Sequence, residues 1–227
     1  MTTTVAIRTQ VSASLRRSPI VAVVRTAQQQ EAARQARLLL ASGIEMIEIT
    51  FSVPEAPALV RQLLAGRGEP GPPWIGMGTV STAARARAAV DAGAEFFVTP
   101  NTSAPVAHEC RQAGIFLIMG ALTPTEIVTA HELGADLVKV YPLPTVGGPA
   151  YLSVVRQPLG DIPMLAAGGF GPDEIPAYAR AGASAFGIAV PLLVGTDAAA
   201  AGEEEARRRI ARALALARGH GESEADR

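Results

Sequence analysis

The chain has 227 residues, 48% of them hydrophobic, and its 20 basic and 21 acidic side chains give a formal net charge of −1. This length and apolar content suit one domain with a sizeable core, and the even charge balance argues against nucleic acid or an acidic membrane as a partner. The first ten residues contain no apolar signal-peptide core, and no segment reaches the roughly 18 uninterrupted apolar residues of a membrane span. We therefore expect a cytoplasmic protein that acts on a small molecule.

A short helix around Gln10–Arg17 is expected first, followed by an alternation of apolar strands and Ala/Arg-rich helices. The expected strands are Ile20–Arg25, Met46–Phe51, Trp74–Val80, Glu95–Pro100, Phe116–Leu122, Asp136–Tyr141, Met164–Gly169 and Ala185–Val190. The expected helices are Gln28–Ala41, Pro54–Leu64, Thr82–Asp91, Ala104–Ala113, Pro124–Leu133, Pro149–Pro158, Asp173–Ala181 and Glu203–Ala217.

A weak internal repeat supports this division of the chain. Several helical runs end in a glycine just before the next strand, namely Gly43, Gly93, Gly114, Gly134 and Gly182. Glycine at such a position typically ends a helix in the left-handed backbone conformation. Strand–helix units repeated in this way predict a single α/β domain, a parallel (β/α)8 TIM barrel over residues 1–218. An open doubly wound sheet is the alternative, although no Gly-x-Gly-x-x-Gly turn follows the first strand. Residues 219–227 are predicted to be a disordered polar tail.

Lys139 is the only lysine of the chain, and every other basic side chain is arginine. An arginine substitutes for lysine as a solvated charge, but only a lysine loses its proton readily enough to attack a carbonyl and form a Schiff base. Lys139 lies between Val138 and Val140 near the end of an expected strand. Its placement is typical of a desolvated nucleophile, while a strand-end lysine paired with a carboxylate is the structural alternative.

Glu48 is the natural partner of Lys139, because each is a charged residue within an apolar strand. In a barrel of this kind the inward side chains of alternate strands share a layer, so the second and sixth strands bring the two together. A carboxylate beside a Schiff-base lysine supplies the proton transfers that dehydration and carbon–carbon cleavage need. The alternative is a buried ion pair that holds the barrel together, in a sugar-acid-binding or structural subunit without catalysis.

Further candidate residues lie at the carboxyl ends of the strands, where such barrels bind their substrates. Arg25 ends the first expected strand and offers a clamp for a carboxylate or phosphate. Thr79 offers a hydroxyl at the end of a glycine-rich third strand, and Pro100 ends the fourth. Gly168, Gly169 and Gly187 lie on the last two strands, where barrels often hold a phosphate with backbone amides. The histidines, His108, His131 and His220, lie in expected helices or in the tail, so no metal or other cofactor is expected.

The order of several motifs resembles the class I aldolases of the 2-keto-3-deoxy-6-phosphogluconate and 2-keto-3-deoxy-6-phosphogalactonate type. The resemblance covers residues 18–195 and rests on segments 20–25, 47–50, 76–80, 98–101, 138–142, 147–152 and 167–169. It implies a homotrimeric, metal-free barrel that cleaves a 2-keto-3-deoxy sugar acid phosphate into pyruvate and glyceraldehyde 3-phosphate. It also implies that Lys139 forms the Schiff base and Glu48 moves protons. Thr79 and Pro100 would then line the pyruvate pocket, and Gly168, Gly169 and Gly187 would hold the phosphate.

The chain departs from the family pattern at two positions. Ser52 stands where some members have a carboxylate-binding arginine, and Arg25, which the galactonate-type branch also has, is the expected replacement. Ala189 stands where the family has a phosphate-binding serine, and losing one such hydrogen bond costs about 1.5–3 kcal/mol. An unphosphorylated 2-keto acid such as 4-hydroxy-2-oxoglutarate is therefore the alternative substrate.

Overall fold

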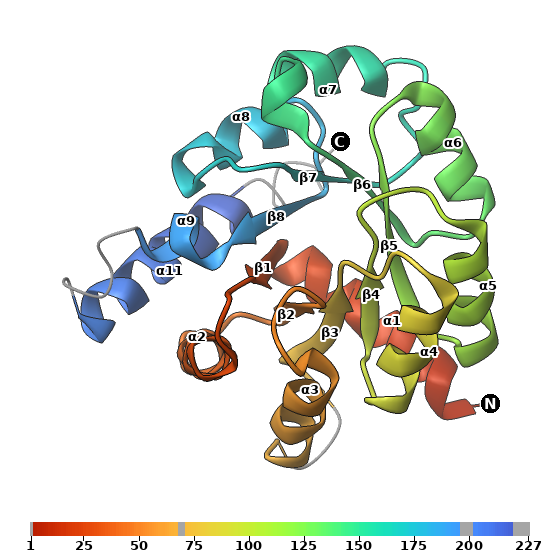
Figure 1. The fold of residues 1–227 in the computed structure, drawn as a ribbon. Helices are drawn as coiled ribbons and strands as arrows, with labels where there is room; N and C mark the ends of the chain where they lie inside the picture. Colours follow the sequence, from red (N-terminus) through yellow and green to blue (C-terminus); the bar gives the residue numbers. More distant parts are fainter. Residues whose placement is uncertain (1, 68–70, 196–201, 220–227) are drawn as a thin grey trace.

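The computed structural model describes residues 2–67, 71–195 and 202–219. Its strands are all parallel and close into a barrel in chain order, and helices surround them (Figure 1). The strands are β1 (Ile20–Val24), β2 (Met46–Thr50), β3 (Trp74–Gly78), β4 (Phe96–Val98), β5 (Phe116–Ala121), β6 (Leu137–Val140), β7 (Met164–Ala167) and β8 (Ala185–Ala189). The predicted (β/α)8 barrel is confirmed, and the open sheet is excluded because β1 pairs with β8.

The surrounding α-helices are α1 (Thr2–Arg17), α2 (Gln29–Ala41), α3 (Ala56–Ala65), α4 (Ala83–Asp91), α5 (Ala104–Ala113), α6 (Pro124–Glu132), α7 (Pro149–Arg156), α8 (Ile175–Arg180), α9 (Val190–Val194) and α11 (Glu203–Arg218). Two 3-10 turns, η1 (Leu143–Val146) and η2 (Pro172–Glu174), precede α7 and α8. The repeated glycines have the expected left-handed backbone, with φ of 77° at Gly43 and 94° at Gly182. The predicted tail lies outside the described residues, except for Gly219.

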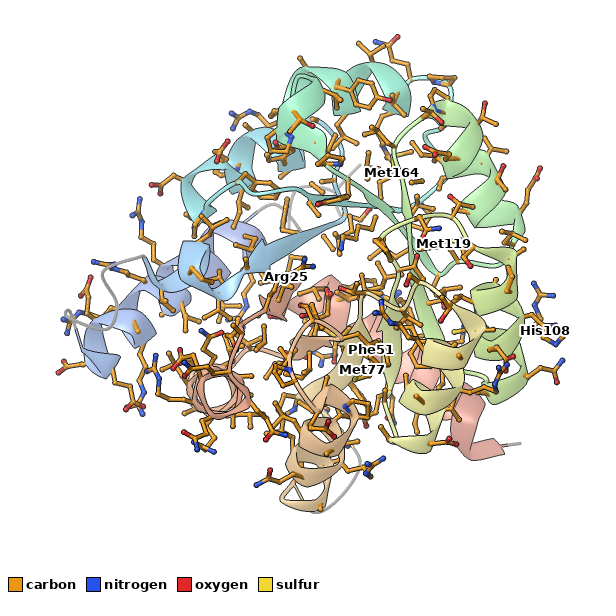
Figure 2. The ribbon with its side chains drawn as sticks, viewed as in Figure 1. Arg25, Phe51, Met77, His108, Met119 and Met164 are labelled. Carbon is orange, nitrogen blue, oxygen red and sulfur yellow. The ribbon has the colours of Figure 1, made fainter. Side chains whose placement is uncertain are left out.

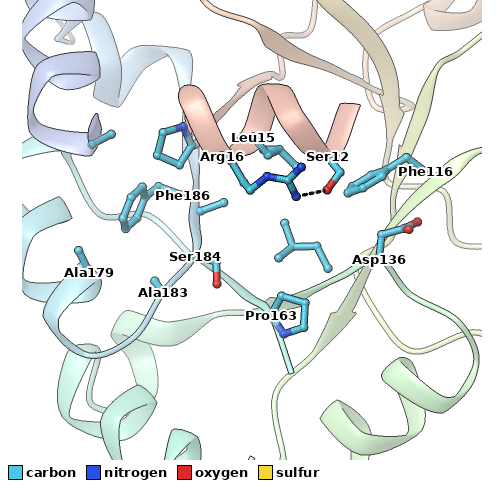
Figure 3. Close-up of a pocket in the computed structure, with 14 residues that line it drawn as sticks. Ser12, Leu15, Arg16, Phe116, Asp136, Pro163, Ala179, Ala183, Ser184 and Phe186 are labelled. Carbon is cyan, nitrogen blue, oxygen red and sulfur yellow. Dashed lines mark hydrogen bonds between the residues drawn. The ribbon is translucent and has the colours of Figure 1, made fainter. Parts of the chain in front are cut away.

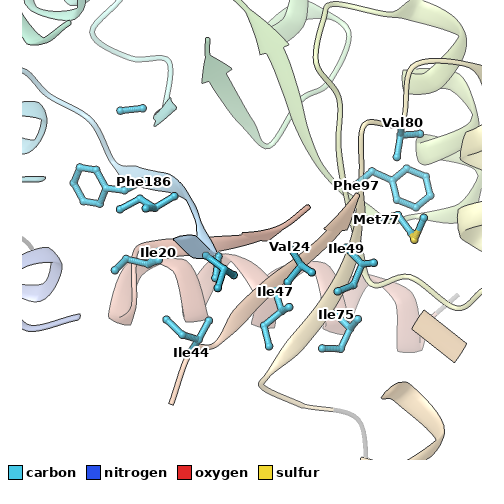
Figure 4. Close-up of a cluster of buried hydrophobic side chains, with 14 of the residues drawn as sticks. Ile20, Val24, Ile44, Ile47, Ile49, Ile75, Met77, Val80, Phe97 and Phe186 are labelled. Atoms are coloured by element: carbon cyan, nitrogen blue, oxygen red, sulfur yellow. The ribbon is translucent and has the colours of Figure 1, made fainter. Parts of the chain in front are cut away.

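Alternation along the strands divides the apolar side chains into an outer and an inner cluster. In β2, Ile47 and Ile49 face the helices and belong to the outer cluster, part of which Figure 4 shows along the strands. Met46, on the other face, belongs to the inner cluster together with Trp74 and Phe96. These large inward side chains belong to the first residues of their strands, so they fill the amino-terminal half of the barrel.

Helix α1 closes this amino-terminal end. Val11 and Leu15 pack into the inner cluster, and the indole nitrogen of Trp74 donates a 2.8 Å hydrogen bond to Ser14 Oγ. The prediction of a short helix around Gln10–Arg17 was wrong at its start, because α1 begins at Thr2. Threonine, valine and isoleucine are frequent between residues 2 and 9, and their low helix propensity hides the first turns in the sequence.

Candidate active site

The strand pattern places Lys139 and Glu48 on the inner face of the barrel. In β6, Val138 and Val140 belong to the outer cluster, so Lys139 between them faces inward. In β2, Ile47 and Ile49 place Glu48 inward in the same way. Both are one or two residues from the carboxyl end of their strand, as expected for a barrel active site.

Glu48 is 1% exposed, and its Oε1 has no hydrogen-bond partner among the described residues. Burial raises the pKa of the Glu48 carboxyl, and the positive charges of Lys139 and Arg25 oppose this rise. The carboxyl therefore lies within electrostatic reach of both cations. A carboxyl of raised pKa holds and releases a proton closer to neutral pH, as general acid–base chemistry requires.

Lys139 is half-buried, less enclosed than the sequence suggested. Its ammonium nitrogen lies 5.3 Å from the ring centroid of Tyr141, two residues further along the chain. Tyr141 is 42% exposed, so this side of the lysine is open to the solvent. An amine with one accessible side and one side toward Glu48 can receive a carbonyl substrate.

Arg25 and Thr79 meet across the mouth of the barrel. Arg25 directly follows β1, and Thr79 directly follows β3. Nη2 of Arg25 donates a hydrogen bond of 3.4 Å to Oγ1 of Thr79. In Figure 2 the labelled Arg25 lies toward the centre of the ring of strands. Thr79 has φ of 58°, in the left-handed region that a β-branched residue rarely occupies. Such strain commonly marks functional sites.

Pro100 is held in place by the residues on either side of it. Thr99 is completely buried, and its hydroxyl donates to the carbonyl of Asn101 over 2.7 Å and accepts from the amide of Gly120 over 2.8 Å. A Cβ at Gly120 would come within 2.4 Å of the Pro100 carbonyl carbon. Because residue 120 in β5 is glycine, the turn after β4 can pack closely against the carboxyl end of β5.

The predicted phosphate-binding glycines lie on the opposite side of the mouth from Thr79. Gly168 and Gly169 follow β7 with φ of 136° and 102°, and a Cβ at Gly168 would approach the Leu143 amide nitrogen to 2.8 Å. Gly187 is half-buried on the inner face of β8, where its Cβ would meet Leu165 and Ala167. Ala189 ends the strand as a half-buried methyl group, and Pro191 in α9 has no amide hydrogen to offer.

Other features lie away from this end of the barrel. A cavity of about 510 Å³ lies at the opposite, amino-terminal end, between α1 and the starts of β5 to β8 (Figure 3). His108 and His131 are exposed on α5 and α6, His108 at the periphery in Figure 2, while His220 lies outside the described residues. No group of three metal-binding side chains occurs within the described ranges.

Two contributors to the site carry no strong sequence signal. Phe51 follows β2, and its amide donates to the carbonyl of Gly78 over 2.9 Å. The guanidinium of Arg85, in the first turn of α4, lies 5.3 Å from the centroid of the Phe51 ring. A cation in a first turn opposes the helix dipole, and this is a weak local signal for Arg85 in the sequence.

The family model for KDPG and KHG aldolases matches residues 11–204 of this chain. The chain belongs to this aldolase family. A 2-dehydro-3-deoxy-phosphogluconate aldolase of Treponema pallidum is 32% identical over 168 residues, 73% of this chain and 77% of the relative. A probable 2-dehydro-3-deoxy-6-phosphogalactonate aldolase of Rhizobium meliloti is 30% identical over 175 residues, 77% and 81% of the two chains. These relatives are lyases, and the protein is accordingly an aldolase-family enzyme.

Solved structures agree with this membership. A native KDPGal structure is 26% identical and superposes with a TM-score of 0.77 over 90% of this chain and 96% of its own. A 4-hydroxy-2-oxoglutarate/2-dehydro-3-deoxyphosphogluconate aldolase is 27% identical, with a TM-score of 0.76 over 90% and 97% of the chains. The described part of this aldolase-family chain contains no helix long and apolar enough to cross a membrane.

Proposed function

We propose that the protein is a class I aldolase that cleaves a 2-keto-3-deoxy sugar acid into pyruvate and an aldehyde. The observation that carries this proposal is the inward pair of Lys139 and Glu48 at the carboxyl end of the barrel, with the lysine charge acting on the buried carboxyl. A buried carboxyl and an accessible amine on the inner face of the same barrel are the groups that Schiff-base chemistry requires.

The chemistry follows from these two groups. The neutral amine of Lys139 attacks the C2 carbonyl, and the carbinolamine takes a proton from the protonated Glu48 and loses water, which gives an iminium ion and leaves Glu48 as the carboxylate. Glu48, as carboxylate, removes the proton of the C4 hydroxyl while the C3–C4 bond breaks, which releases the aldehyde and leaves an enamine on the lysine. The protonated Glu48 returns this proton to C3, and water then hydrolyses the pyruvyl iminium ion, which releases pyruvate and the free amine and gives a proton back to Glu48.

The remaining residues suit the two ends of the substrate. Arg25 and the hydroxyl of Thr79 form a polar pair for the carboxylate, and Pro100 forms an apolar wall near the methyl group of pyruvate. Gly168, Gly169 and Gly187 bring backbone without side chains to the side where the aldehyde leaves, and of the three only Gly169 has open space beside its α-carbon. With a phosphorylated substrate, this aldehyde is glyceraldehyde 3-phosphate.

An unphosphorylated substrate such as 4-hydroxy-2-oxoglutarate is the second candidate. It is favoured by the methyl group of Ala189 and by Pro191, which together leave the end of β8 without a hydroxyl and with one amide donor fewer. The KHG/KDPG aldolase of Escherichia coli, 26% identical over 205 residues, is named for both kinds of substrate. A homotrimer, as the sequence resemblance implies, also remains a proposal.

Aldol cleavage is tested by coupling pyruvate release to lactate dehydrogenase, with matched phosphorylated and unphosphorylated 2-keto-3-deoxy acids. We expect cleavage by the parent protein and none by Lys139→Met that stays folded by circular dichroism. Loss of the fold in Lys139→Met, together with an inactive parent, would instead favour the structural ion pair. The ratio of kcat/KM for the two substrates decides between the phosphorylated and the unphosphorylated class.

A further inference from the structure

Thr79 stands out as a strained residue within the candidate site. Among the described residues, only Glu55 and Thr79 have positive φ without being glycine. Thr79 is β-branched, and a residue of this kind stays in the strained left-handed region only where its surroundings hold it there. The conformation of Thr79 therefore needs a fixed partner.

Arg85 supplies that partner. Its Nη1 donates to the carbonyl oxygen of Thr79 over 3.1 Å and to Ser81 Oγ over 3.0 Å. Arg25 meanwhile donates to the hydroxyl of the same threonine. Thr79 is thus contacted by two guanidinium groups, one on its side chain and one on its backbone.

Arg85 also joins two neighbouring loops of the barrel mouth. Its guanidinium lies over the ring of Phe51, after β2, while its hydrogen bonds reach residues that follow β3. The amide of Phe51 in turn bonds to the carbonyl of Gly78, directly before Thr79. The contacts of the Arg85 side chain therefore fix the position of Thr79 relative to the carboxyl end of β2, the strand that carries Glu48.

Stability of α4 does not account for the arginine. The helix is capped by Thr82, whose side chain accepts from the backbone amide of Arg85, and any residue with an amide can make that bond. A positive charge in the first turn is unfavourable toward the helix dipole. Arg85 is half-buried, and within the described ranges its partners are a carbonyl, a hydroxyl and an aromatic ring rather than a carboxylate.

We propose that Arg85 is a positioning residue, which holds Thr79 in its left-handed conformation so that the Thr79 hydroxyl and Arg25 together receive the carboxylate of the 2-keto acid. This inference rests on the proposed function, because it assigns that carboxylate to Arg25 and Thr79. Arg85 acts through Thr79, and its loss affects substrate binding more than the chemistry at Lys139.

Steady-state cleavage kinetics of Arg85→Met provide the test, with Arg87→Met as the matched control. Arg87 lies on the same helix and pairs with Glu109 at the surface. We expect the KM of Arg85→Met to rise about tenfold with kcat within about threefold of the parent, and Arg87→Met to match the parent in both. Arg85→Lys, which keeps a donor and the charge, should recover part of the loss. An unchanged KM, or a fall in thermal stability alone, would overturn the proposal.

A double-mutant cycle separates action through Thr79 from an independent role. If Arg85 acts through the Thr79 hydroxyl, Arg85→Met adds little to the KM of Thr79→Val. Fully additive effects would overturn the positioning role. Trapping with pyruvate and borohydride shows whether a negative result concerns the positioning role of Arg85 alone or the proposed aldolase function as well. Adduct formation on Lys139 at saturating pyruvate should survive in Arg85→Met, whereas absence of the adduct in the parent would overturn both proposals.

Discussion

The carboxyl group of Glu48 lies directly against the α-carbon of Gly78 on the neighbouring strand. A Cβ at Gly78 would come within 1.8 Å of Glu48 Oε1, a separation that real atoms do not show. Residue 78 must therefore be glycine for the carboxyl to occupy its place inside the barrel.

Gly78→Ala should thus displace Glu48 and remove most of the activity, about 100-fold or more in kcat, because the base loses its place beside the substrate. We also expect a loss of about 1–3 kcal/mol in the free energy of unfolding from overpacking. Gly66→Ala, at the end of α3 with φ of −83° and its nearest contact at 3.6 Å, is the matched control. A fully active Gly78→Ala would contradict the role of Glu48.

The burial of Glu48 predicts a pH-dependent cost in stability. Its pKa is raised in the folded protein above the ordinary value of 4.5, so the folded state binds the proton more tightly than the unfolded chain. The stability that comes from this tighter proton binding is fully present below the pKa of Glu48 in the unfolded chain. It is lost as the pH rises through the pKa of Glu48 in the folded protein.

Glu48→Gln should accordingly match the parent in stability near pH 4 and exceed it at pH 8. This gain in the free energy of unfolding should raise the Tm at pH 8, by roughly 2–4 °C for each kcal/mol. The same variant should lose about 100-fold or more in kcat, because an amide transfers no proton. Thermal unfolding across this pH range provides the measurement, and an equal destabilisation of Glu48→Gln at every pH would argue against the pKa shift.

Ala189→Ser should shift the enzyme toward phosphorylated substrates. A hydroxyl at the end of β8 adds one hydrogen bond to a charged group, which is worth about 1.5–3 kcal/mol, or roughly tenfold or more in affinity. We expect kcat/KM to rise for the phosphorylated substrate and not for its unphosphorylated counterpart. Ala150→Ser, on the exposed surface of α7, is the control. Equal changes in kcat/KM for both substrates would indicate that the phosphate does not bind beside residue 189.

The apolar surface around α7 is where we expect subunits to meet if the proposed homotrimer forms. The exposed large apolar side chains of the described residues are Tyr141, Val146, Val154 and Leu192, and three of these four belong to the segment from β6 to α7. Val154 is 64% exposed, so Val154→Glu should disrupt a trimer without unfolding the barrel. Light scattering measures the mass, with Leu192→Glu as a matched control. A parent protein of monomeric mass would remove the proposed interface.

The sequence predicts the barrel well because its signals are local. Apolar runs and glycine caps recur in each unit, and the alternation in β2 and β6 already turns Glu48 and Lys139 inward. Arg85 was missed because its partners, Thr79 and Phe51, become neighbours only when β2 and β3 pair. The contact between Glu48 and Gly78 likewise depends on strand register, which no single strand reveals. The half-exposed position of Lys139 also follows from the assembled mouth rather than from its own apolar neighbours.

The central claim is that Lys139 forms the Schiff base, and trapping with pyruvate and sodium borohydride tests it most directly. Peptide mapping by mass spectrometry locates the adduct, and the single lysine leaves the N-terminal amine as its rival. We predict one reduced pyruvyl adduct on Lys139 and none on Lys139→Met. A folded parent protein that forms no adduct, or forms it only at the N-terminus, would contradict the Schiff-base mechanism and leave Lys139 and Glu48 as a structural ion pair.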